Sequence, residues 1–183
     1  MKHSATPAVL STSLAVLGAA LLSACATSAP TAPTAPAALK PLDSERVAFV
    51  WQAVGSQIYE CRADAGKMVW VFIAPEAELT NDKGDKAGTH GAGPSWTALD
   101  GSKTVGTVKA RANGTQPADI PLLLLSAKAA AGSPAGKMSS ITSVQRLNTE
   151  GGNAQAKGCD TPLDAGKRSK EGYTSDYVFF TAR

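Results

Sequence analysis

The fold class is decided by two runs, QIYEC (residues 57–61) and KMVWVFIA (residues 67–74). The first alternates polar and apolar side chains with a period of two, and the second is rich in β-branched and aromatic residues, so both predict β-strands. Further runs of this kind occupy residues 104–112, 120–127, 139–147 and 173–181, and turn-forming sequences lie at 81–84 and 100–102. The pattern predicts an all-β fold, an antiparallel sandwich or barrel-like single domain with long irregular loops.

The segment DSERVAFVWQAV (residues 43–54) is ambiguous. The aspartate and serine at its start could cap a helix. Its β-branched and aromatic side chains favour a strand that leads into residues 57–61, and we predict a strand. Loops are expected at 132–136 and 151–170.

The first residues of the chain have the features of a secretory leader. Lys2 and His3 precede an apolar stretch from about residue 8 to residue 22. This stretch is too short for a permanent membrane span, which needs roughly 20 apolar residues. It ends in LSAC (residues 22–25), which resembles the lipobox of bacterial lipoproteins. We therefore predict a lipoprotein signal peptide over residues 1–24 and lipidation of Cys25.

The residues after Cys25 predict a tether. Residues 26–38 contain only Ala, Thr, Ser and Pro, a composition that cannot form a core and prefers extended conformations. We assign the lipidated cysteine and the tether to residues 25–42 and the β domain to residues 43–183. Ala26 stands where a retention signal of Gram-negative lipoproteins has Asp, so we expect a lipid-anchored protein of the cell envelope, sorted to the outer membrane.

The charge of the chain argues against a nucleic-acid partner. The formal net charge is +3, but no Asp or Glu precedes Asp43, so all 15 acidic residues lie in the predicted domain. Lys2 and Lys40 precede it, which leaves 16 of the 18 basic residues in the domain and a net charge there of +1. That balance does not provide a phosphate-binding surface.

Two cysteines remain beyond the predicted lipidation site, Cys61 and Cys159. An exported domain folds under oxidising conditions, so we predict a disulfide between them. A metal site that adds His90 and Asp160 is the alternative. Neither cysteine belongs to a CxxC motif or a close Cys/His pair, and we predict no metal.

The order of several motifs in the chain resembles the DUF3455 family, an uncharacterised set of exported bacterial and fungal proteins, over residues 44–181. The motifs are GxQIYxC (55–61), W (70), APEA (74–77), GxHxAGPxW (88–96), DGS (100–102), IPxLLL (120–125), IxxVQRLNTxGG (141–152), GCD (158–160) and YTxDY (173–177).

The resemblance implies export and a compact β fold with paired cysteines, but no reaction. Two positions depart from the family pattern: Gly91 and Leu122 stand where aromatic residues are usual, so a pocket that depends on those aromatics would be altered here. Some relatives carry a malate dehydrogenase label. This chain has no GxGxxG between a strand and a helix, so we expect no dinucleotide and no other cofactor.

The segment GTHGAGPSW (residues 88–96) is the most unusual local sequence. His90 is the only histidine outside the leader and could act as a general base, oriented by a nearby aspartate such as Asp100. Other candidates for the orienting acid or for a nucleophile are Asp82, Asp85, Ser95 and Ser102. Neither serine lies in a GxSxG motif. The alternative is a glycine-rich loop with Trp96 in the core.

Other side chains could contact a ligand or a substrate. His90, Trp96, Gln145 and Arg146 are the candidate ligand-binding residues. Glu76 and Glu78 share one face of a strand and could form a carboxylate pair, although such a pair is more often a solvated surface. Trp51 and Trp70 could line a cleft with Trp96 or pack in the core.

These observations favour a non-enzymatic binding or structural module of the periplasm or cell surface, with a small molecule or an envelope partner as its ligand. The alternative is a hydrolase that acts on an envelope substrate and uses His90 with nearby carboxylates.

Overall fold

A computed structural model describes residues 1–3 and 30–183 of the chain. The predicted lipidation site at Cys25 and nearly all of the predicted signal peptide lie outside the described residues. None of the helices in the described residues is long and apolar enough to cross a membrane.

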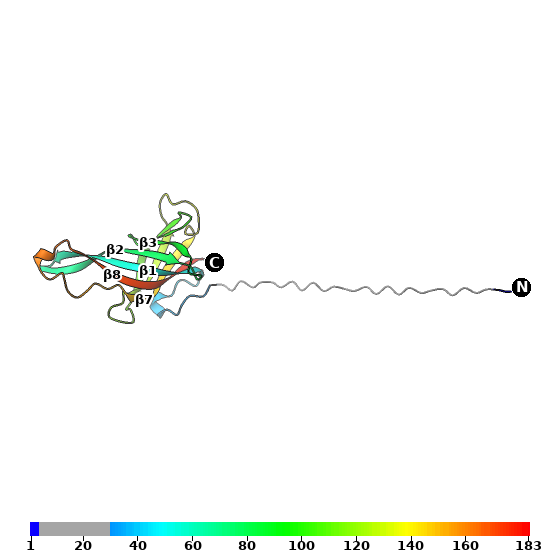
Figure 1. Cartoon of the computed structure of the whole chain (residues 1–183), viewed down its shortest axis with the longest axis horizontal. Coiled ribbons are helices and arrows are strands. Elements are labelled where there is room, and N and C mark those ends of the chain that lie inside the picture. Colours follow the sequence, from blue (N-terminus) through cyan, green and yellow to red (C-terminus); the bar gives the residue numbers. More distant parts are fainter. Residues whose placement is uncertain (4–29) are drawn as a thin grey trace.

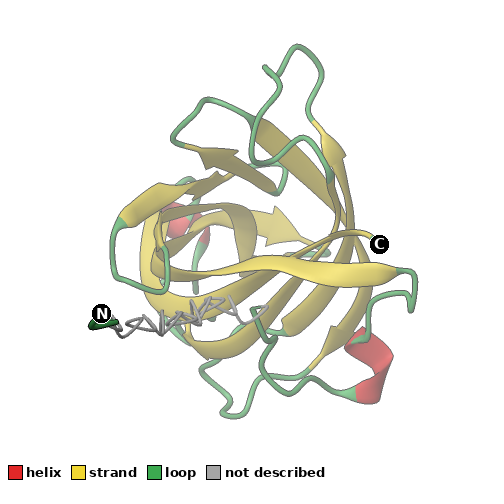
Figure 2. Ribbon diagram, turned by 90° about the vertical axis from the view of Figure 1, so that its right-hand side faces the viewer, coloured by secondary structure: helices red, strands yellow, loops and turns green. Residues whose placement is uncertain are grey.

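The domain is an antiparallel sheet of eight strands that closes into a barrel, each strand pairing with the next and the last with the first (Figures 1 and 2). The all-β prediction is confirmed, and the structure decides for a barrel over a sandwich. The strands are β1 (Glu45–Asp64), β2 (Lys67–Thr80), β3 (Lys86–Gly91), β4 (Ser95–Ala98), β5 (Lys103–Ala112), β6 (Leu122–Ala129), β7 (Ile141–Gly151) and β8 (Arg168–Ala182), with short 3-10 helices η1 (Ala37–Leu39) and η2 (Pro162–Asp164).

The strand β1 runs without interruption through the segment that was ambiguous between helix and strand, so the prediction of a strand there is confirmed. Its hairpin with β2 turns at Ala65 and Gly66, which both have positive φ. Positive φ at both central residues is typical of the type I′ turn, whose twist matches that of the paired strands. β1 pairs with β2 on one side and β8 on the other, and these three long strands extend beyond the rest of the barrel (Figure 1).

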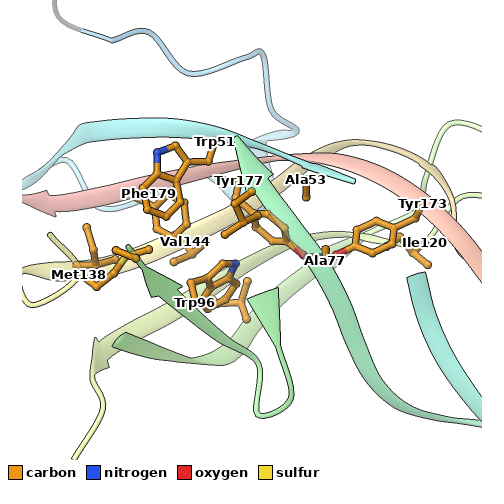
Figure 3. Close-up of a cluster of buried hydrophobic side chains, with 14 residues drawn as sticks. Trp51, Ala53, Ala77, Trp96, Ile120, Met138, Val144, Tyr173, Tyr177 and Phe179 are labelled. Atoms are coloured by element: carbon orange, nitrogen blue, oxygen red, sulfur yellow. Dashed lines mark hydrogen bonds between the residues drawn. The ribbon is translucent and has the colours of Figure 1, made fainter. Parts of the chain in front are cut away.

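Aromatic side chains fill one end of the barrel interior. Trp51, Trp96, Tyr177 and Phe179 are buried there and contact one another, with Trp96 and Phe179 meeting edge to face. Figure 3 shows these rings together, with Tyr173 and Ile120 farther along the barrel. A Cβ at Gly106 would lie 2.9 Å from the Trp96 ring, so glycine provides the space for the indole. We call this group of four aromatic residues the aromatic plug; it closes the end of the barrel where β1 begins and β8 ends.

A second apolar cluster lies on the outer face of the barrel. Leu147, Val178 and Phe180 are buried although they alternate with interior positions. They are covered by residues 30–42, which we call the N-terminal strap, and Leu39 of the strap is 0% exposed. The Gln145 side-chain amide donates a 2.5 Å hydrogen bond to the Leu39 carbonyl oxygen. The later part of the predicted tether thus packs on the barrel, a contact that composition alone did not indicate.

The predicted disulfide is confirmed: Cys61 and Cys159 are bonded, with Cα atoms 5.4 Å apart. The bond attaches the irregular segment between β7 and β8 to the end of β1. It also occupies both thiols of the alternative metal site, and no group of three or more potential ligands occurs among the described residues.

Candidate functional site

A pocket of about 360 Å³ opens at the end of the barrel opposite the aromatic plug. Ligand pockets in proteins usually have volumes of about 300–1,000 Å³ and largely apolar walls. An eight-stranded barrel has an interior wide enough for one small ligand where side chains do not fill it. The lining residues come from six strands and three loops: Gln57, Tyr59, Phe72, Ile73, Pro75, His90, Gly93, Pro94, Val108, Arg111, Ile120, Pro121, Leu123, Arg146 and Asn153.

His90 lies on the wall of the pocket, at the end of β3. Its ring Nδ1 lies 2.8 Å from the carbonyl oxygen of Ser95. Because a carbonyl oxygen only accepts, Nδ1 carries the proton and, in the neutral ring, Nε2 has none. Burial is the main cause that lowers the pKa of His90, to about 3; the charge of Arg146 lowers it further, and the hydrogen bond to Ser95 opposes the shift. The imidazole is therefore neutral at physiological pH.

Gln57 provides a polar group that lacks a partner inside the barrel. Its side chain is 2% exposed, and no acceptor among the described residues lies within full hydrogen-bonding geometry of Nε2; the Tyr173 hydroxyl is its nearest polar neighbour, and the amide lowers the pKa of that phenol. Next to it the Tyr59 hydroxyl donates a 2.8 Å hydrogen bond to the carbonyl oxygen of Gly152. A Cβ at Gly152 would lie 3.2 Å from the Gln57 Cγ and 2.8 Å from the Tyr173 Cβ, so this loop approaches as closely as a glycine allows. A buried donor without an acceptor costs about 1–3 kcal/mol, which a ligand acceptor would recover.

Arg146 brings a positive charge into the pocket. Its Nε and Nη2 atoms donate hydrogen bonds of 3.0 and 2.8 Å to the Pro121 carbonyl oxygen. The guanidinium forms no ion pair within the described part of the chain. A second guanidinium, that of the exposed Arg111, lies among the lining residues, and no Asp or Glu does.

The tyrosines near the pocket are neutral. Burial, the largest cause, raises the pKa of both Tyr59 and Tyr173. Glu171 also raises the pKa of Tyr59, while Arg146 acts in the opposite direction on both phenols. The positive charge of Arg146 therefore lowers the pKa of three groups around the pocket: His90, Tyr59 and Tyr173.

The structure separates the four predicted ligand-binding residues. His90 and Arg146 line the pocket. Trp96 is buried in the aromatic plug and stacks on the His90 ring, so it supports the wall and does not form it. Gln145 points to the outer face of the barrel, where it bonds to the N-terminal strap.

The predicted catalytic pair of His90 and Asp100 is not brought together. Asp100 lies in the turn between β4 and β5, at the plugged end, and accepts hydrogen bonds from the Ser102 backbone, the Ser102 hydroxyl and the Lys137 backbone. These bonds lower the pKa of Asp100, with the Lys137 amide as the largest cause.

The remaining catalytic candidates have structural or surface roles. The Ser95 hydroxyl donates to the Ala92 carbonyl oxygen, and Asp85 accepts a bond from Asn81 in the turn between β2 and β3, where Asp82 also lies. Glu76 and Glu78 are exposed and pair with Lys170 and Lys86. Trp51 is in the plug, and the Trp70 indole donates to the Lys157 carbonyl oxygen.

Sequence reasoning missed Gln57 as a site residue, although the signal was present. Trp51, Gln57 and Tyr59 share one face of β1, and a polar residue on an otherwise apolar, buried face indicates a candidate site residue. Neither position that departs from the family pattern is among the residues that line the pocket. Leu122 faces the N-terminal strap, and a Cβ at Gly91 would meet open space.

A family model described as "Protein of unknown function (DUF3455)" matches residues 41–181. Neither the curated proteins nor the solved structures include a match to the chain. The matched range contains every pocket residue.

Proposed function

The chain belongs to the DUF3455 family, and for this member we propose a function in binding: the barrel takes up one small, largely apolar molecule without converting it. The observation that carries the proposal is the pocket of about 360 Å³ with a buried, unpartnered Gln57 amide in its wall. Apolar walls with a few fixed polar groups are typical of ligand sites.

The surroundings of His90 favour binding over the alternative of hydrolysis. A general base works best when its pKa lies near the working pH, and the pKa of His90 is lowered to about 3. Its Nδ1 bonds to a backbone carbonyl, where a catalytic triad would place a carboxylate. We therefore assign His90 to the pocket wall.

We further propose that the protein is a lipoprotein of the cell envelope, attached through Cys25 to the outer membrane. The support is the lipobox LSAC at residues 22–25, which follows an apolar leader. Pro30 and Arg183 line one surface groove at the plugged end of the barrel. A domain tethered from that end directs its pocket away from the lipid.

The binding proposal is tested by titration with 1-naphthylamine, a neutral apolar dye small enough for the pocket, whose emission shifts to the blue in apolar surroundings. We expect saturable binding of one dye per chain. The variant Leu123→Trp places a larger side chain in the pocket and should abolish binding. Val54→Trp is the matched control, because Val54 is 65% exposed on the outside of the barrel.

The two variants also distinguish binding in the pocket from nonspecific adsorption of the dye. Circular dichroism checks that each variant is folded, and Val108→Phe serves as a milder pocket-filling change if Leu123→Trp does not fold. Equal dye binding by wild type, the pocket variant and the control would contradict the proposal, as would the absence of saturable binding to the wild type.

A further inference from the structure

We infer that the pocket selects an amphiphile with a single carboxylate, which Arg146 and Gln57 bind while the apolar body lies along the barrel interior. This inference rests on the proposed binding function and specifies the chemical class of its ligand.

The charge of the pocket favours an anion. The wall contains the guanidinium of Arg146, which is partly buried and has no carboxylate partner among the described residues. A buried charge is unfavourable unless a counter-charge or several hydrogen bonds compensate it. The bonds to the Pro121 carbonyl use one N–H each of Nε and Nη2, so N–H groups on Nη1 and Nη2 are left for a ligand.

The hydrogen-bonding groups fit a carboxylate. Arginine binds the two oxygens of a carboxylate with parallel N–H groups, and the bonds are strong because both partners are charged. The Gln57 Nε2 amide offers an additional buried donor in the same pocket. His90 has no N–H to give, because Nδ1 already donates to Ser95. The anion therefore belongs on Arg146 and Gln57.

The rest of the wall fits a hydrocarbon. Ile73, Val108, Ile120 and Leu123 line the pocket, and Phe72, which is 49% exposed, lies in the same wall. At about 30 Å³ for each water-sized group, a volume of about 360 Å³ accommodates roughly twelve non-hydrogen atoms. A carboxylic acid with a chain of about ten carbons is the matching probe.

The test compares decanoate with decan-1-ol as competitors of the neutral dye. The two probes have similar chains and differ in charge. For the wild type we expect decanoate to bind at least tenfold more tightly, about 1.4 kcal/mol. In Arg146→Gln this preference should disappear while decan-1-ol binds as before. Arg46→Gln, an exposed arginine at the plugged end, is the control and should retain the preference.

A second variant distinguishes ligand binding from a structural role. Gln57→Met replaces the unpartnered amide by an apolar side chain of similar size. We expect decanoate to bind less tightly while the melting temperature of the ligand-free protein stays equal or rises, because a buried unsatisfied donor is removed. A fall in melting temperature with unchanged decanoate affinity would overturn the role of Gln57. This variant also keeps the inference testable if Arg146→Gln does not fold.

The outcomes separate the inference from the proposal on which it rests. Saturable dye binding with equal displacement by decanoate and decan-1-ol would overturn the carboxylate assignment and leave the binding function intact. Absence of dye binding to the wild type would overturn both.

Discussion

The imidazole of His90 stacks on the indole of Trp96, with ring centroids 4.8 Å apart and ring planes 15° from parallel. The stack connects the pocket wall to the aromatic plug. The Tyr177 ring also packs against His90, with the two ring centroids 4.8 Å apart. His90 is 4% exposed as a result. The histidine that the sequence offers as a catalytic base is therefore a neutral part of the barrel interior.

The burial of His90 predicts a dependence of stability on pH. Burial, with a contribution from Arg146, lowers its pKa to about 3, whereas a histidine in the unfolded chain titrates near about 6.5. Between these values only the unfolded state takes up the proton, so stability is complete above the unfolded pKa and falls as the pH decreases. The slope is at most about 1.4 kcal/mol per pH unit.

The measurement is urea unfolding of the wild type and His90→Gln at pH about 7 and about 4.5. Carboxylates titrate alike in both proteins, so their effect cancels in the difference. We expect the wild type to lose roughly 2–3 kcal/mol more than the variant over this range. Parallel losses in the two proteins would show that the buried imidazole does not control this dependence.

The packing of the N-terminal strap predicts that substitution of one leucine, which lies outside the family motifs, strongly lowers the stability of the protein. Leu39 is 0% exposed, so Leu39→Ala should lower the free energy of unfolding by about 2–5 kcal/mol through lost burial and a cavity. Leu42, only three residues later, is 70% exposed, and Leu42→Ala should change stability by less than about 0.5 kcal/mol. Equal effects of the two substitutions in chemical denaturation would contradict the packing of the strap.

The disulfide predicts that the protein is less stable to unfolding when the bond is absent. The bond spans 98 residues, and a loop of this length stabilises by up to about 4.7 kcal/mol on the loop-entropy model. The double variant Cys61→Ser, Cys159→Ser should therefore unfold at a lower denaturant concentration, with a loss of about 2–5 kcal/mol. Peptide mapping without reductant should recover the two cysteines in one linked pair, and free thiols at both positions would refute the bond.

The proposed anchor predicts an acylated N-terminus. Mass spectrometry of the mature protein should find Cys25 as its first residue, carrying acyl chains. Cys25→Ser should release the protein from the membrane fraction, because anchoring needs the acyl chains. An unmodified N-terminus at another position would refute the anchor.

The sequence was sufficient to predict the strands, but not to predict that the sheet closes into a barrel. Alternation along QIYEC and the apolar composition of KMVWVFIA define two strands locally. Closure depends on the long-range pairing of β1 with β8, in which Trp51 lies opposite Tyr177. A pairing between residues this far apart leaves no local sequence signal, so a sandwich and a barrel are equally compatible with the pattern.

Sequence reasoning predicted only part of the site, because the rest depends on how the chain folds. Arg146 and His90 are chemically distinctive, and both line the pocket. Gln145 adjoins Arg146 in sequence, but side chains of a strand alternate between its faces, so the two residues lie on opposite sides of the barrel wall. Composition also could not show that a strap rich in Ala and Pro covers the outer apolar cluster, since that contact depends on the folded surface.

Binding inside the barrel is tested most directly by methyl chemical shifts in nuclear magnetic resonance spectra recorded during a titration with decanoate. We expect the methyl groups of four residues that line the pocket to shift and saturate together: Ile73, Val108, Ile120 and Leu123. The methyl groups of Val54 and Leu163, which are 65% and 91% exposed outside it, should stay unchanged. Shifts confined to the exterior methyl groups, or no saturable shift in the pocket, would contradict binding inside the barrel.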